Sequence, residues 1–117
     1  MYGSAMLKQN HFQGANAYIA KEILEASPQK LLIKIYDYAI VHCKKGNMLK
    51  TNAAIEELIH SLNFELDETQ EVATGLLRLY QFCEDQMRKN NTEIVYEILT
   101  TLRETWLTAF NKKIAEE

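Results

Sequence analysis

Residues 26–40 read ASPQKLLIKIYDYAI, and this stretch has the features of a well-defined helix start. Ser27 offers a side-chain oxygen as an N-cap, and Pro28 suits the first helical position, where its missing N–H has no partner to lose. Because the residue before a proline avoids the helical region, any preceding helix should end here. The stretch therefore predicts a helix from residue 28 to about residue 45, which ends near Gly46 and Asn47.

Helical spacing of apolar residues recurs on both sides of this segment, and no segment alternates in the manner of a β-strand. The pattern predicts a short leading helix over 15–26 and three further helices over 49–63, 68–89 and 93–114. The apolar stripe of the 68–89 helix comprises Val72, Leu76, Leu79, Tyr80, Cys83 and Met87, and Trp106 lies in the middle of the last stripe. Because short links favour antiparallel neighbours, we expect an all-α fold, an antiparallel up-and-down four-helix bundle with a short leading N-terminal helix.

Composition limits the class of protein. The chain has 117 residues, of which 47% are hydrophobic, with one proline and four glycines, so it suits one domain with a real core. We expect a flexible N-terminal segment over 1–14 and a single helical-bundle domain over 15–117. A net charge of −3 argues against nucleic acid. With no secretory signal and no apolar run of about 20 residues, the expected setting is the cytoplasm, without membrane insertion.

The residue types that carry chemistry are scattered. His11, His42 and His60 form no pair at metal-binding spacing, and Cys43 and Cys83 lie inside apolar helical patterns. No glycine-rich phosphate loop, nucleophile elbow or Cys-x-x-Cys motif occurs. The sequence therefore predicts a protein that is not an enzyme and has no metal or cofactor.

Two of the predicted helices carry more apolar surface than a small bundle needs. Apolar residues of the 28–45 helix cover about 200° of its circumference, whereas a core-facing stripe needs only somewhat over about 100°. The 93–114 helix has a second apolar line beside its main stripe. The surplus positions are Ile33, Tyr36 and Ile40 on the first of these helices, and Tyr96, Leu107 and Ile114 on the second.

This surplus has two explanations that periodicity does not separate. The 28–45 helix can be the most enclosed member of the bundle, covered by the leading helix. Alternatively, the six surplus residues line a groove that takes a helix from a second copy of the chain or from a client. The tyrosines favour a groove, because a tyrosine buries its ring while its hydroxyl stays at a wet rim.

Several stretches together resemble one known family. NAYIAKEILEASPQKLLIKIYDYAI (16–40) resembles the N-terminal signature of the FliS family, the flagellar export chaperones. LNFELD (62–67) is similar to that family's link between its third and fourth helices, and LLRLYQFCEDQM (76–87) and LRETWLTAF (102–110) resemble its last two helices. The likeness extends over nearly all of 16–110. Two departures are Tyr38, where the family usually has glycine, and a shorter link before the last helix.

The resemblance implies a cytoplasmic chaperone that binds the disordered C-terminal segment of flagellin, prevents its premature assembly and delivers it to the membrane-embedded export gate. It also implies an N-terminal cover over the groove, in which Phe12 and Tyr18 would be the apolar anchors; Tyr18 would also line the groove. Such recognition couples folding of the client to helix-in-groove binding. The alternative is a FliS-like adaptor, or a homodimeric bundle, with a different secreted client.

Overall fold

The computed structural model describes residues 27–65 and 67–116, and the side chains of this range as far as Lys112. The chain divides into two compact units, Met1–Leu31 and Leu32–Glu117. The leading helix over 15–26 and the boundary at residue 15, both predicted from the sequence, lie outside the described residues. Within the described part, no helix has the length and apolar character needed to cross a membrane.

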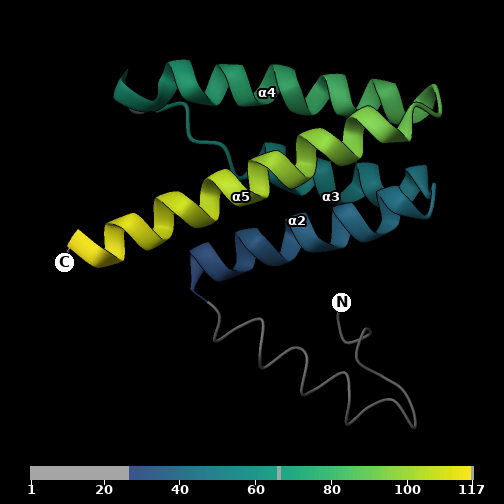
Figure 1. Cartoon of the computed structure of the whole chain (residues 1–117). Coiled ribbons are helices and arrows are strands. Elements are labelled where there is room, and N and C mark those ends of the chain that lie inside the picture. The colour runs from purple at the N-terminus through teal and green to yellow at the C-terminus, as the bar shows by residue number, and fades with distance from the viewer. Residues whose placement is uncertain (1–26, 66, 117) are drawn as a thin grey trace, which may run out of the picture. The chain divides into compact units, whose positions relative to one another are not determined.

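Four helices make up nearly all of the described chain, and Figure 1 shows them in order. They are α2 (Pro28–Lys44), α3 (Met48–His60), α4 (Asp67–Arg88) and α5 (Thr92–Glu116). No boundary differs from its predicted position by more than three residues. The described residues contain no strand. The predicted all-α fold is therefore confirmed.

Local signals fix the helix ends. The Ser27 hydroxyl accepts a hydrogen bond from the Lys30 backbone N–H at 3.1 Å, as expected of an N-cap. Gly46 ends α2 with a φ of 74°, a conformation that glycine adopts without strain. Asn47 then begins the next helix, because its side-chain oxygen accepts from the Lys50 N–H at 3.1 Å. From the sequence, Asn47 was expected only at the end of the preceding helix.

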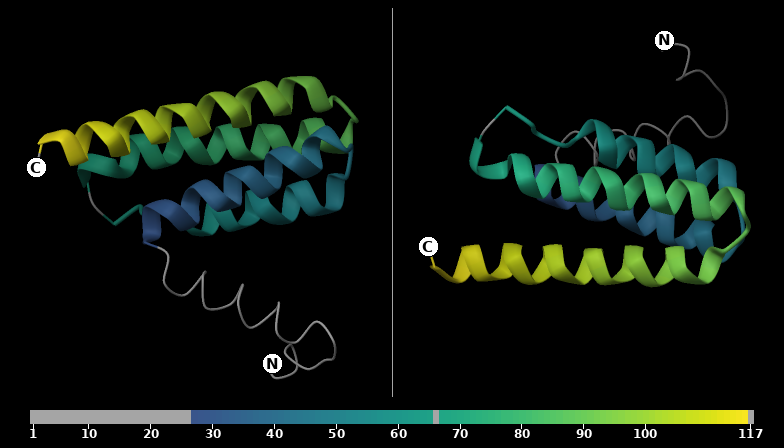
Figure 2. Two further views of the ribbon diagram at one scale, coloured as in Figure 1. Left: turned by 60° about the horizontal axis from the view of Figure 1, so that its bottom comes forward. Right: turned by 90° about the horizontal axis from the view of Figure 1, so that it is seen from above.

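Within the unit that begins at Leu32, consecutive helices run antiparallel. Figures 1 and 2 show the tight turns α2–α3 and α4–α5 at one end, whereas the longer α3–α4 link lies at the other. The closest packing between neighbouring helices joins α3 to α4 and α4 to α5. The predicted antiparallel bundle is confirmed for these four helices.

The core lies where the four helices face one another. Its buried apolar members are Tyr36, Ala39 and Cys43 of α2; Ala54, Ile55 and Leu58 of α3; Tyr80, Cys83 and Met87 of α4; and Val95 and Leu99 of α5. Both cysteines are free and fully buried. The prediction that they are buried thiols is confirmed.

The predicted stripe of α4 was wrong at one position. Val72 is 61% exposed, and Ala73 is buried in its place. Ala73, Tyr80 and Met87 recur every seven residues and mark the centre of the buried face, and Val72 lies about 100° from Ala73 on the helix. The same face buries a charged residue that the sequence analysis did not identify, Glu84, which is 6% exposed.

Candidate functional site

An apolar hollow of about 350 Å³ opens near the α3–α4 link. Three helices and the α3–α4 link contribute to it. Its lining comprises Leu32 of α2; Ser61, Leu62 and Asn63, which follow α3; Thr69, Val72, Ala73, Leu76 and Tyr80 of α4; and Trp106 of α5. A hollow lined by Leu, Val and Trp suits an apolar side chain from a partner.

Three aromatic side chains stabilise the inner side of this hollow. The Tyr36 and Tyr80 hydroxyls are hydrogen-bonded to each other, and the Trp106 indole N–H donates to the Tyr36 hydroxyl at 3.0 Å. Burial raises the pKa of both tyrosines, so both phenols stay neutral. Because these polar groups satisfy one another, the inner side of the hollow presents ring surface rather than unpaired donors.

The outer rim of the hollow is held in place by its own polar contacts. The Asn63 side-chain oxygen accepts from the Glu65 N–H at 2.9 Å, and the Thr69 hydroxyl lies 3.4 Å from the Asn63 carbonyl oxygen, to which it donates. Beside these residues, Phe64 and Val72 are exposed. Two exposed apolar side chains at the edge of an apolar hollow extend the surface that a partner could cover.

The three predicted groove residues of α2 differ in burial and do not form one exposed surface. Tyr36 has no exposed surface and belongs to the core, so it is removed from the surface available to a partner. The cause is its hydroxyl, which finds a buried partner in Tyr80 instead of solvent. Ile40 is half-buried and packs against the core, and Ile33 is half-buried without belonging to that cluster. Neither isoleucine is among the residues that line the hollow.

On α5, Tyr96 and Leu107 differ in exposure. Tyr96 is exposed, with the Lys44 ammonium 5.5 Å from the centre of its ring, and Leu107 is half-buried. Neither lines the hollow. The side chains of Ile114, Tyr18 and Phe12 lie outside the described residues, so the predictions made for them stay predictions.

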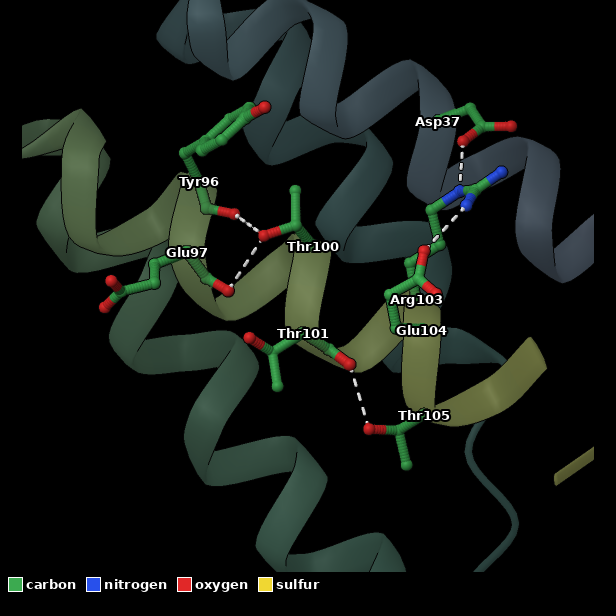
Figure 3. A network of polar contacts seen from close by, with 8 residues as sticks. All are labelled: Asp37, Tyr96, Glu97, Thr100, Thr101, Arg103, Glu104 and Thr105. Carbon is green, nitrogen blue, oxygen red and sulfur yellow. Dashed lines mark hydrogen bonds and ion pairs between the residues drawn. The ribbon is translucent and has the colours of Figure 1, made fainter. Parts of the chain in front are cut away.

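The outer surface of α5 is rich in threonine and borders an open hollow of about 620 Å³, lined by Thr100, Thr101, Glu104, Thr105, Thr108 and Ala109. Figure 3 shows the Thr100 hydroxyl donating to the Tyr96 and Glu97 carbonyls and the Thr105 hydroxyl donating to the Thr101 carbonyl. Hydroxyls that bond back to their own helix present mainly methyl groups outward. The hydroxyls of Thr100 and Thr105 are therefore already engaged within α5.

A buried acid of α4, Glu84, is hydrogen-bonded to an exposed acid of α3, Glu56. Burial, a hydrogen bond to Glu56 and the negative charge of Glu56 raise the pKa of Glu84 to about 7, and Arg88 opposes this shift. Nearby, the Asn52 side-chain amide donates to the Glu84 backbone carbonyl at 3.2 Å. Among the described residues, the pair belongs to no cluster of three or more side chains that could hold a metal ion. We interpret it as a pH-dependent contact between two helices.

Replacing Glu84 with glutamine should therefore change how stability depends on pH. The folded pKa of Glu84 exceeds its unfolded value, so the folded state binds more protons, and stability falls as pH rises from about 4.5 to about 7. At about pH 8, Glu84→Gln should raise the free energy of unfolding by about 1 to 3 kcal/mol, with little change at about pH 4. Urea unfolding at the two pH values measures this. Glu57→Gln, an exposed position on α3, is the control and should show no such difference.

Comparison with known proteins identifies one family. The sequence model of the family described as "Flagellar protein FliS" matches residues 11–113. This match covers well over half of the chain and includes all of the hollow's lining residues. Comparisons with curated proteins and with solved structures found no match.

Proposed function

Because the chain belongs to the FliS family, the flagellin export chaperones of the cytoplasm, we propose that it binds the C-terminal segment of flagellin through the hollow beside the α3–α4 link. The family is one of chaperones rather than enzymes, in agreement with the scattered His and Cys residues of the sequence. The observation that carries the proposal is the hollow itself, which is apolar and bordered by Val72, an apolar side chain that is 61% exposed.

The physical basis is burial of apolar surface by a client that folds as it binds. An amphipathic segment that becomes helical presents apolar residues at a spacing of three and four, and one of them can enter the hollow between Leu76 and Trp106. Such a segment would otherwise expose these residues in the cytoplasm, where they favour premature assembly. We further propose that the loaded chaperone delivers the client to the cytoplasmic domain of the export gate. No covalent step is involved.

A titration followed by the intrinsic fluorescence of the chaperone tests this proposal. Trp106 is the only tryptophan of the chain and lines the hollow, so a tryptophan-free peptide of the flagellin C-terminal segment should shift its emission as it binds. We expect saturable binding with a Kd of about 1 μM or tighter and one peptide per chain.

A peptide from the N-terminal segment of the same flagellin is the matched control and should leave the emission unchanged. Calorimetric binding without any change in Trp106 emission would place the client elsewhere on the chain. Absence of binding by both methods would contradict the proposal. Self-association of the chaperone, which sedimentation detects, would instead support the homodimer that the sequence left open.

A further inference from the structure

Four residues of α4 form an apolar line on a side of the helix about 120° from its buried face. They are Val72, Gly75, Leu79 and Phe82, and we call this line the outer ridge. Val72 is 61% exposed and Phe82 44%, whereas Leu79 is half-buried. Gly75 is exposed, with open space where a side chain would begin. The outer ridge is therefore an apolar surface that the described helices leave partly uncovered.

The spacing of the outer ridge is the one that packs two helices side by side. Its members follow one another at intervals of three, four and three residues, as in the seam of a coiled coil. In such a seam each side chain enters a space between residues of the facing helix. Gly75 provides such a space, because it has no Cβ to fill it. A helix with a matching ridge therefore fits this side of α4.

An antiparallel second copy of the chain supplies the matching ridge. In a two-fold arrangement about an axis near Leu77, Val72 lies opposite the partner's Phe82, and Gly75 lies opposite the partner's Leu79. Each pair then joins a larger side chain to a smaller one, which favours close packing. A parallel pair would instead set Gly75 against Gly75 and Phe82 against Phe82, which leaves a gap at one level and crowds the other. A two-fold contact is closed, so association stops at the dimer.

The same pairing brings a side chain of the second copy to the apolar hollow. Val72 lines that hollow, so the partner's Phe82, which lies opposite Val72, reaches its edge. Phe82 itself borders a separate hollow of about 570 Å³ at the α4–α5 turn, together with Glu93 and Ile94. By symmetry the partner's Val72 lies there. Each copy therefore contributes an aromatic ring to the border of the other copy's apolar hollow.

The charges beside the outer ridge keep this pairing weak. Arg78 is exposed on one flank of the ridge, and the antiparallel arrangement brings it next to the partner's Arg78. On the same flank Glu71 approaches the partner's Asp85, a like charge, although Lys89 pairs with Asp85 at 3.2 Å. Exposed like charges oppose association slightly, and salt screens them. The dimer is therefore weak, and salt should strengthen it.

We propose that chains without a client pair through the outer ridge of α4, antiparallel about an axis near Leu77, and that Phe82 of each copy covers the edge of the other copy's apolar hollow. A flagellin segment that occupies the hollow and covers Val72 then separates the two copies. The pairing depends on the outer ridge alone, whereas the competition with flagellin rests on the proposed function.

Sedimentation equilibrium of the full chain tests the pairing. We expect a monomer–dimer equilibrium with a Kd of about 10 to 100 μM, as suits a small interface, and tighter association in about 0.5 M salt. Phe82→Asp should weaken the association at least about tenfold, because the carboxylate must lose its water in the dimer. Gly75→Leu should weaken it at least about fivefold by filling the space for the partner's Leu79. The same variant should raise the urea midpoint of the monomer, since leucine favours a helix more than glycine does and has open space here.

Matched controls separate the outer ridge from exposed apolar residues in general. Leu49→Asp makes the same kind of change at a residue of α3 that is 77% exposed, and it should leave the association within about twofold of the wild-type value. An equimolar mixture of wild type and Arg78→Glu should associate at least about threefold more tightly than either chain alone, because an arginine then meets a glutamate across the axis. Circular dichroism verifies the helix content, and Gly75→Leu provides an independent test should Phe82→Asp lose it.

Three results would overturn the pairing: a chain that stays monomeric up to about 1 mM, unchanged association in both Phe82→Asp and Gly75→Leu, and a mixture with Arg78→Glu that gains nothing. The flagellin C-terminal peptide should convert the dimer to complexes of one chain and one peptide, and a dimer that binds the peptide without separating would overturn the competition. Phe82→Asp should bind the peptide at least as tightly as wild type, because Phe82 is not among the lining residues of the apolar hollow. Loss of peptide binding by both wild type and this monomeric variant would contradict the proposed function and not the pairing.

Discussion

Replacing Trp106 with alanine should lower the free energy of unfolding by about 3 kcal/mol, the lower end of the range for large aromatic residues in cores. Trp106 is half-buried, packs against the core and stacks on Phe110 with ring centres 5.6 Å apart. Its indole N–H also donates to the Tyr36 hydroxyl. The substitution removes both the packing and the hydrogen bond. Urea unfolding followed by circular dichroism measures the loss, because the variant has no tryptophan to report it.

Trp106→Phe separates the two contributions. It keeps most of the apolar contact and removes only the donor to Tyr36, whose hydroxyl retains Tyr80 as a partner. We expect it to cost about 1 kcal/mol. A loss below about 1 kcal/mol for Trp106→Ala would show that α5 does not pack through this residue.

Replacing Val72 with aspartate should weaken binding of the flagellin C-terminal peptide at least about tenfold while leaving the fold intact. Val72 is 61% exposed, so a carboxylate at this position is hydrated in the free chaperone. It must lose that water, without a counter-charge from the lining residues, when a client covers the hollow. Calorimetric titration measures the affinity, and circular dichroism verifies that the helices persist.

Val41→Asp is the matched control, because it introduces the same group at an exposed valine on the outward side of α2. It should leave flagellin binding within about twofold of the wild-type value, since no contact with that client is proposed there. Equal losses for the two variants would point to a general effect of negative charge. Normal binding by Val72→Asp would exclude the hollow as the client site.

Most of the fold was predictable because its signals are local. The Ser27–Pro28 start and the apolar spacing within each helix depend on neighbours in the sequence, and these predictions are confirmed. Asn47 was harder to assign, since a single asparagine between two helices suits the end of one and the cap of the next. The N-terminal predictions involving Phe12 and Tyr18 lie outside the described residues.

The candidate site was less predictable, because it depends on which face of each helix the others cover. Spacing alone treated Tyr36 as surplus apolar surface, whereas its buried partner Tyr80 comes from a helix 44 positions along the chain. It also assigned Val72 to the core, although the seven-residue recurrence of Ala73, Tyr80 and Met87 indicates the correct face. Ile40 packs against the core, so a carboxylate there would test folding and not client binding. Val72 is the better probe.

Alkylation of the two buried cysteines can measure how often the bundle opens. Cys43 lies on α2 and Cys83 on α4, and neither has exposed surface. Burial raises the pKa of the Cys43 thiol, and it raises that of Cys83 to about 12, so very little reactive thiolate exists at neutral pH. An alkylating reagent can therefore reach them only in molecules whose helices have separated. The labelling rates of Cys43 and Cys83 then measure the free energies of the openings that expose α2 and α4. A client that holds the helices together should slow both rates.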